Sequence, residues 1–224
     1  EPVKTRSGNY QSEAALEKEF ICMLTEQGYE YLTIHEEDDL INNLRGQLEK
    51  LNNYNFSQAE LDRFFRECIA NQNEGIVEKT RKIQEDNIQV LKRDDGSTKN
   101  ITLIDKKNIH NNFLQVINQY VIGTVQGAKR DNRYDVSILV NGFPLVHIEL
   151  KRRGVAIREA FNQINRYQRD SFWAGSGLFE YTQIFVISNG TNTKYYSNST
   201  RFNAIKDVNA AAMSKKSKTS NSFE

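Results

Sequence analysis

Cysteine, proline and tryptophan are scarce in this sequence, and the scarcity of cysteine excludes some classes of protein. There are two cysteines, two prolines and one tryptophan in 224 residues. Cys22 and Cys68 both fall in apolar stretches with helical spacing, which argues against a disulfide framework and against a thiolate zinc site. We expect both thiols to be buried as small hydrophobic groups.

Long apolar runs are also absent. No stretch approaches the roughly 20 apolar residues that span a bilayer, and the first ten residues contain no apolar signal region. We therefore expect a cytoplasmic protein without membrane contact. Lys and Arg total 30 against 29 Asp and Glu, so a nucleic-acid surface would have to be a local patch. The phosphate-binding motifs G-x-x-x-x-G-K-S/T and G-x-G-x-x-G do not occur, which argues against nucleotide binding.

The length suits one large domain with its own core, or a domain with an insertion. We assign residues 1–11 to an N-terminal extension and residues 12–205 to the domain, within which 36–85 are mainly helical. Residues 206–224 end in a stretch rich in Ala, Ser, Lys, Thr and Asn, which is typical of a linker. We therefore expect the chain to be part of a longer protein.

Helical patterns dominate the first half. Ser12 precedes an apolar repeat that stops at Gly28, which predicts a capped helix with a glycine end. Further helices are expected over 37–51 and 155–169, and a short strand over 29–34. Ser57 and Glu60 have the spacing of a capping box before another helix.

From Asn87 onward the apolar period is two, which indicates strands. A hairpin is predicted over 88–104, a strand over 113–124, and short strands over 183–188 and 194–197. The strongest hairpin signal joins 134–140 to 143–151 through Asn141-Gly142.

Apolar and polar residues alternate in this last hairpin. The apolar positions are Tyr134, Val136, Ile138, Val140, Val146, Ile148 and Leu150. If these face one core, the polar positions share the opposite face, and these are Asp135, Ser137, His147, Glu149 and Lys151. A plain two-residue turn would place Asp135 opposite Ile148, on the wrong face. We therefore predict an odd-length loop or a bulge near residues 141–143. The residue numbers of each cross-strand pair would then add up to an even value, which places Asp135 on the same face as Glu149.

Two carboxylates a few ångströms apart suit a hard divalent cation such as Mg²⁺. We expect Asp135 and Glu149 to be metal ligands, and Lys151 to orient a nucleophile or neutralise charge during phosphodiester hydrolysis. The alternative is a strand end that carries solvated charges. The site is favoured because the strand before Lys151 is otherwise apolar, so ionisable groups there need partners.

Several motifs spread over most of the chain carry a resemblance to a known family. They are Gln27-Gly28-Tyr29-Glu30, Thr80-Arg81-Lys82-Ile83, Leu103-Ile104-Asp105-Lys106-Lys107-Asn108, Arg133-Tyr134-Asp135-Val136, Val146-His147-Ile148-Glu149-Leu150-Lys151, Gln163-Ile164-Asn165-Arg166-Tyr167 and Ile187-Ser188-Asn189-Gly190-Thr191. These segments resemble the N-terminal nuclease domain of the motor (HsdR) subunit of type I restriction enzymes.

The resemblance implies a PD-(D/E)xK nuclease, an α/β domain with a restriction-endonuclease-like mixed central sheet flanked by helices. It makes Asp135 and Glu149 metal ligands and Lys151 the catalytic lysine. Tyr134 stands where the superfamily pattern has proline, which removes no ligand. Glu17 matches the extra acidic residue that many members place beside the metal, and Glu13 is a weaker match.

Gln163 and Tyr167 are four residues apart, on one helical face, and match the Q-x-x-x-Y motif of this nuclease branch. The resemblance implies that they brace the active site and contact the DNA backbone. Four nearby arginines suit phosphate contacts that carry no sequence information, although solvated charges remain the alternative: Arg152, Arg153, Arg158 and Arg166.

The implied function is a Mg²⁺-dependent, type I site-specific deoxyribonuclease that cuts double-stranded DNA. Family resemblance further implies ATP-driven translocation by helicase-like domains that this chain lacks, and partner subunits for methylation and sequence specificity. The competing hypotheses are a stand-alone, structure-selective nuclease of the resolvase kind and a non-catalytic DNA-holding or docking module.

Overall fold

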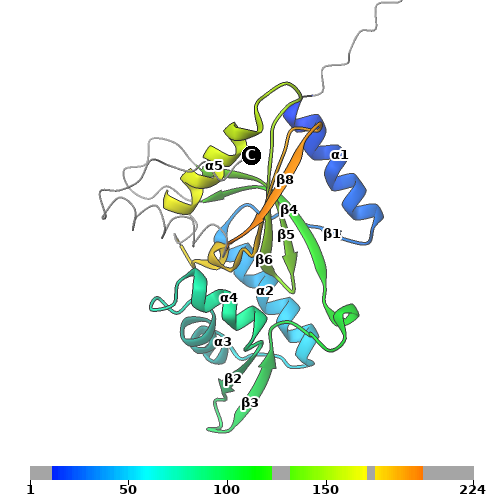
Figure 1. Ribbon diagram of the computed structural model, residues 1–224. Helices are drawn as coiled ribbons and strands as arrows, with labels where there is room; N and C mark the ends of the chain where they lie inside the picture. Colours follow the sequence, from blue (N-terminus) through cyan, green and yellow to red (C-terminus); the bar gives the residue numbers. More distant parts are fainter. Residues whose placement is uncertain (1–11, 123–131, 171–174, 199–224) are drawn as a thin grey trace, which may run out of the picture.

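The computed structural model describes residues 12–122, 132–170 and 175–198 (Figure 1). The extension at 1–11 and the linker at 206–224 lie outside the described residues. The helices are α1 (Glu13–Glu26), α2 (Glu37–Asn52), α3 (Gln58–Phe64), α4 (Ile76–Gln84) and α5 (Ile157–Asp170). A π-helical turn, η1 (Phe65–Ile69), and two 3-10 turns, η2 (Ile109–Asn111) and η3 (Leu178–Tyr181), complete the helical elements of these ranges. Within them, no helix combines the length and apolar composition that a bilayer crossing requires.

A six-stranded mixed sheet with the order β1-β4-β5-β6-β7-β8 forms the centre of the fold. Its strands are β1 (Glu30–Tyr31), β4 (Leu114–Ile122), β5 (Asn132–Val140), β6 (Phe143–Leu150), β7 (Ile184–Ser188) and β8 (Thr193–Ser197). β1 and β4 are parallel, as are β6 and β7, and the other neighbours are antiparallel. The expected restriction-endonuclease-like α/β fold is confirmed.

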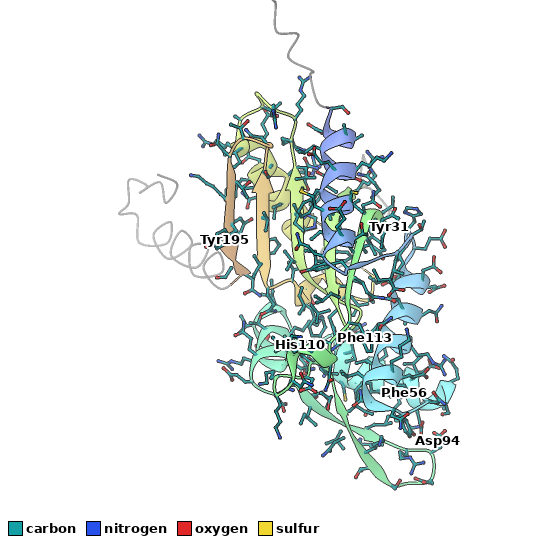
Figure 2. All side chains as sticks on the ribbon, turned by 90° about the vertical axis from the view of Figure 1, so that its right-hand side faces the viewer. Tyr31, Phe56, Asp94, His110, Phe113 and Tyr195 are labelled. Atoms are coloured by element: carbon teal, nitrogen blue, oxygen red, sulfur yellow. The ribbon has the colours of Figure 1, made fainter. Side chains whose placement is uncertain are left out.

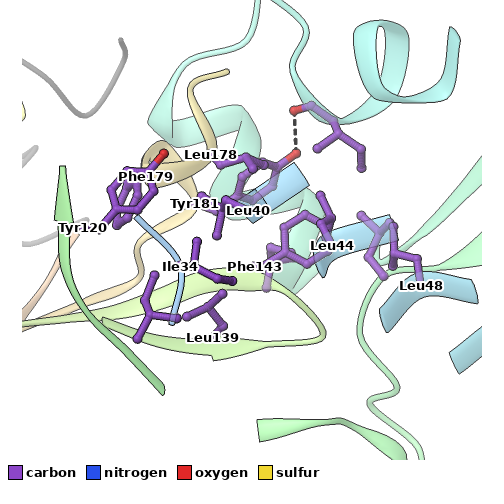
Figure 3. Packing of buried hydrophobic residues seen from close by; sticks show 14 of the residues in the cluster. Ile34, Leu40, Leu44, Leu48, Tyr120, Leu139, Phe143, Leu178, Phe179 and Tyr181 are labelled. Atoms are coloured by element: carbon purple, nitrogen blue, oxygen red, sulfur yellow. Dashed lines mark hydrogen bonds between the residues drawn. The ribbon is translucent and has the colours of Figure 1, made fainter. Parts of the chain in front are cut away.

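Helices cover both faces of the sheet. Four residues of α1 pack on one face, namely Leu16, Phe20, Ile21 and Leu24. Side chains of α2, α5 and η3 form a larger core on the other face, and Figure 3 shows part of it around Leu44, Phe143 and Tyr181. Polar residues at the centre of the sheet are therefore enclosed by protein on both sides.

The segment 36–85 contains α2, α3, η1 and α4. The hairpin of β2 (Ile88–Lys92) and β3 (Thr98–Thr102) follows and extends away from the main sheet, with Asp94 at its tip (Figure 2). An ion pair between the buried Lys79 of α4 and the half-buried Glu180 of η3 joins the helical segment to the rest of the domain.

The helix caps predicted from the sequence are confirmed. Ser12 accepts a hydrogen bond from the N–H of Ala15, and Ser57 and Glu60 form both hydrogen bonds of the capping box. The strand expected over 29–34 is reduced to Glu30–Tyr31. The expected burial of both cysteines is wrong, because Cys22 lies on the solvent side of α1 and Cys68 is half-buried.

Candidate active site

A tight turn at Asn141 and Gly142 connects β5 to β6. Both residues adopt left-handed backbone conformations, with φ values of 51° and 84°. A Cβ at residue 142 would lie 2.6 Å from Leu44 Cα, so glycine is required there. Asn141 is buried, and its side chain makes hydrogen bonds with three partners: Leu103 O, Asn112 Oδ1 and the N–H of Phe113.

The pairing of the hairpin corrects one prediction and confirms another. Val140 pairs with Phe143, so the turn has two residues and the odd-length loop is wrong. A bulge is nevertheless present deeper in the hairpin, where the register shifts between Ile138 and Leu139 and Leu145 is the extra residue. The bulge lies there because the left-handed Asn141-Gly142 pair already forms a regular two-residue turn. Beyond Leu145 the paired residue numbers have an even sum, as predicted.

This register brings the three candidate catalytic residues together at the end of β6. Asp135 Oδ2 accepts a hydrogen bond of 2.9 Å from the N–H of Leu150. The carboxyl groups of Asp135 and Glu149 are close enough to interact electrostatically, since the charge of Glu149 raises the pKa of Asp135. Lys151 Nζ lies 3.2 Å from Glu149 Oε1. An acid on each strand and a lysine therefore form one cluster.

Glu149 is fully buried and Asp135 is half-buried, which opposes the ionisation of both carboxyl groups. Burial, together with the charge of Glu149, raises the pKa of Asp135 to about 7. Burial also raises the pKa of Glu149 to about 7, although the Lys151 ammonium acts in the opposite direction. Because the two acids interact directly, they titrate as a pair. A carboxyl pair with such raised pKa values, beside a lysine, is typical of a functional site.

The face that carries these acids is itself part of the core. Tyr134 was expected on the apolar face with Val136, but it lies on the other face. Its ring centroid is 5.1 Å from that of His147 and 4.7 Å from that of Tyr167. Tyr134 packs in the larger core and Val136 packs in the core against α1, so the alternation of side chains along β5 is broken at Asp135.

His147 lies behind Glu149 in this enclosed region and is fully buried. Its Nδ1 is 3.4 Å from Ser137 Oγ, and its Nε2 is 3.5 Å from Glu149 Oε2. Burial lowers the pKa of His147 to about 4, so the ring is neutral at physiological pH. His147 therefore contacts Glu149 without adding a charge.

The Q-x-x-x-Y residues lie on α5 beside the acidic pair. Gln163 Nε2 donates to the hydroxyl of Tyr167, and that hydroxyl donates to Arg133 O at 2.7 Å. Arg133 directly precedes the Tyr134-Asp135 segment on β5. The charges of Glu149 and Asp135 raise the pKa of Tyr167, after the larger effect of its burial. The two side chains thus connect α5 to the strand that carries Asp135.

Glu17 points from α1 toward the sheet and is buried. Asn118 Nδ2 and Gln119 Nε2 each donate a hydrogen bond of 2.5 Å to one of its carboxylate oxygens. Its pKa is raised, chiefly by burial, and the charge of Asp135 contributes. Glu13, the weaker candidate, is exposed and accepts a 3.3 Å hydrogen bond from the N–H of Arg152.

The four candidate DNA-binding arginines are all exposed, and they differ in their distance from the acids. Arg166 is the one whose positive charge lowers the pKa of Glu149, and its guanidinium lies over the ring of Tyr167. Arg152 and Arg153 follow Lys151 just after the end of β6, and Arg153 lies against Gly190 at the β7–β8 turn. Arg158 is in the first turn of α5.

The residues present fit a magnesium ion. Glu149 Oε2 is buried and has no hydrogen-bond partner among the described residues, so this oxygen is available as a ligand. Over the same part of the chain, no group of three or more His, Cys, Asp and Glu side chains has the arrangement of a metal site. Mg²⁺ is commonly held by one or two carboxylates and retains several waters, so a pair of acids suffices for it. Asp135 and Glu149 could provide this pair.

Two site residues were not identified from the sequence. Asn118 and Gln119 interrupt the apolar strand β4 with consecutive amides, and this break in the alternation was the available signal. Gln119 has a left-handed φ of 55°, which is unusual inside a strand for a residue other than glycine. The β4–β5 pairing includes Asn118 and Tyr120 but omits Gln119, opposite Asp135.

The mixed sheet and its bulged hairpin define a restriction-endonuclease-like domain. Comparison with known proteins agrees with this class. A sequence model of the family described as "Type I restriction enzyme R protein N terminus" matches residues 10–204. This chain belongs to that family, and the resemblance found in its motifs is confirmed.

Two relatives show how much of a longer protein the chain represents. It is 52% identical over 194 residues to the type I restriction enzyme EcoprrI endonuclease subunit of Escherichia coli, and the match covers 86% of this chain and 61% of that subunit. It is 41% identical over 194 residues to the SsaAORF53P endonuclease subunit of Staphylococcus saprophyticus, covering 84% of this chain and 20% of that subunit. The chain therefore corresponds to part of each relative.

Proposed function

We propose that this chain is a metal-dependent endonuclease domain that hydrolyses phosphodiester bonds of double-stranded DNA within a type I restriction enzyme. The observation that carries the proposal is the cluster of Asp135, Glu149 and Lys151. Glu149 is fully buried, Asp135 is half-buried, both carboxyls have raised pKa values, and Lys151 Nζ lies 3.2 Å from Glu149 Oε1. Folding stability alone does not account for a half-buried acid placed beside a fully buried one.

The proposed cofactor is Mg²⁺, held by Asp135 and Glu149. When bound there, it would supply a positive charge that polarises the scissile phosphate and acidifies a water molecule. Lys151, whose Nζ lies 3.2 Å from Glu149 Oε1, would stabilise negative charge that develops on the phosphate. Tyr167 and Gln163 would keep β5, and with it Asp135, in position through the Arg133 carbonyl.

The DNA backbone is the proposed partner of the exposed arginines. Arg166 is the strongest candidate because it is both exposed and close to Glu149. Arg152 and Arg153 continue from the strand end that carries the site, so a phosphate backbone crossing the site would meet them. Such contacts would position the duplex without reading its sequence.

The names of the relatives refer to endonuclease subunits of type I restriction enzymes. We extend the proposal accordingly to a complex with methyltransferase and specificity subunits, in the cytoplasm. ATP-driven translocation would belong to helicase-like regions of the longer protein. These regions would bring the nuclease domain to its cleavage point.

The test uses the full-length protein in its assembled complex. Single alanine variants at Asp135, Glu149 and Lys151 are expected to abolish cleavage of plasmid DNA while ATP hydrolysis continues. Glu85→Ala, at an exposed acid that ends α4, is the matched control and should cleave normally. Wild-type cleavage by Lys151→Ala would reject the assignment.

The same assays separate the competing functions. Metal-dependent nicking by this chain in isolation would favour a stand-alone nuclease. Cleavage by the assembled enzyme that survives all three alanine variants would favour a docking module. The partial coverage of the relatives supports the multi-domain reading over the stand-alone one.

A further inference from the structure

The strand β4 has an irregular conformation beside the acidic pair. Successive side chains of a regular strand point to opposite faces. Here Asn118 and Gln119 are consecutive, yet both reach Glu17 on α1. The left-handed φ of 55° at Gln119 makes this possible, because it turns the second amide back toward the same face.

Gln119 has two features that are unfavourable for folding stability. A left-handed conformation is unfavourable for a residue with a Cβ, and strain of this kind clusters at functional sites. In addition, Gln119 Oε1 is buried and accepts no hydrogen bond within the described residues. A side chain selected for folding stability alone would carry neither cost. Both features are explained if the backbone of Gln119 is required to place its Nε2 group within hydrogen-bond distance of Glu17.

Asn118 is held in a matching orientation. Its Oδ1 accepts a 2.9 Å hydrogen bond from the hydroxyl of Tyr31, which leaves Nδ2 free to donate to Glu17 Oε1. Gln119 occupies the other carboxylate oxygen, Oε2. Each oxygen of Glu17 is therefore already bonded to an amide, although the carboxylate is close enough to Asp135 for their charges to interact.

The geometry keeps Glu17 apart from the carboxyl pair. Among the described residues, Glu17 does not form a three-ligand metal group with Asp135 and Glu149. Mg²⁺ gives up its waters reluctantly and often binds proteins through them. A carboxylate held near the ion, but not on it, would accept hydrogen bonds from those waters.

We propose that Asn118 and Gln119 are positioning residues that clamp Glu17 beside Asp135, so that Glu17 contacts a cation at the Asp135–Glu149 pair through its water ligands and not directly. This rests on the proposed function. In this role Glu17 is not a third metal ligand. The irregular conformation of β4 serves to orient its carboxylate.

The experiment measures Mg²⁺ binding by the metal-free chain, using calorimetric titration with MgCl₂ and the thermal unfolding midpoint. The variants are Glu17→Gln, Gln119→Gly and their combination, with Asp135→Asn as the reference for a lost ligand. Gln119→Gly removes the amide but accepts the left-handed φ, so the metal-free midpoint should stay close to wild type. Asn100→Ala, at an exposed amide of β3, is the matched control.

Loss of an outer contact typically weakens metal binding by about 10-fold or more. We expect Glu17→Gln and Gln119→Gly each to weaken Mg²⁺ binding by about 10-fold, while Asp135→Asn abolishes it. The double variant should bind no more weakly than either single variant, because both changes break one contact.

Four results would overturn the clamp. They are unchanged or tighter Mg²⁺ binding by Gln119→Gly, unchanged binding by Glu17→Gln, complete loss of binding by Glu17→Gln, and multiplying effects in the double variant. If the wild-type chain itself binds no Mg²⁺, the proposed metal site fails together with the clamp. Binding by wild type with no change in Glu17→Gln would reject the clamp alone.

Discussion

Replacing Glu149 with glutamine should make the metal-free domain more stable at neutral and alkaline pH. The folded state buries this carboxyl completely and raises its pKa from 4.5 to about 7. A rise of this size corresponds to about 3 kcal/mol against the ionised form. Glutamine has nearly the same shape and cannot ionise, so Glu149→Gln removes that opposition.

The pH dependence follows from the sign of the change. A folded-state pKa above the unfolded value means that the folded chain binds the proton more tightly. Stability from this group is therefore present below about pH 4.5 and is lost as the pH rises through about 7. Loss of the contact with Lys151 Nζ works against the gain, so we expect a net stabilisation of about 1 to 3 kcal/mol at pH 8 and little at pH 4.

Urea unfolding at pH 4 and pH 8, in the presence of a chelator, measures the effect. Glu85→Gln is the control for removing an exposed negative charge. Added Mg²⁺ should then stabilise the wild-type chain and leave Glu149→Gln unchanged, because a ligand stabilises only the state that binds it. A variant that is less stable than wild type at pH 8 without metal would refute the reasoning.

Three further predictions concern the scaffold around the site, and all are measured by chemical denaturation. Asn141→Ala loses three hydrogen bonds and places alanine at a φ of 51°, so it should lower the free energy of unfolding by about 3 kcal/mol. Asn141→Gly should lower it by less, and equal losses in the two variants would argue against backbone strain. Tyr167→Phe leaves the Arg133 carbonyl without its 2.7 Å donor and should cost about 1 to 2 kcal/mol, whereas an unchanged midpoint would mean that this bond does not brace β5. Lys79→Met leaves Glu180 without its buried partner and should cost about 3 kcal/mol; Glu180→Gln in the same chain should recover most of that loss, and no recovery would contradict an ion-pair origin.

Local patterns in the sequence predicted most of the secondary structure. The capping box at Ser57 and Glu60, the α1 helix after Ser12 and the strands of the β5–β6 hairpin depend on residues close together in the chain, so their spacing is informative. Strand parity also predicted that an odd-length loop or a bulge near residues 141–143 must return Asp135 to the side of Glu149. The position of that bulge at Leu145 could not be predicted, because an even pairing sum can be reached by an extra residue at any point between the turn and Asp135.

The candidate acids and the lysine were therefore accessible from the strand pattern, since side-chain period is a property of the local backbone. Gln163 and Tyr167 were identified only through the family resemblance of their motif. The environment of these groups was not. Burial of the polar face beneath α5, the raised pKa values of the two carboxyls and the fixation of Glu17 by Asn118 and Gln119 all arise from segments distant in the chain. Ionisation and orientation depend on which groups surround a side chain and exclude water from it, and these neighbours are brought together only when the sheet and its helices pack.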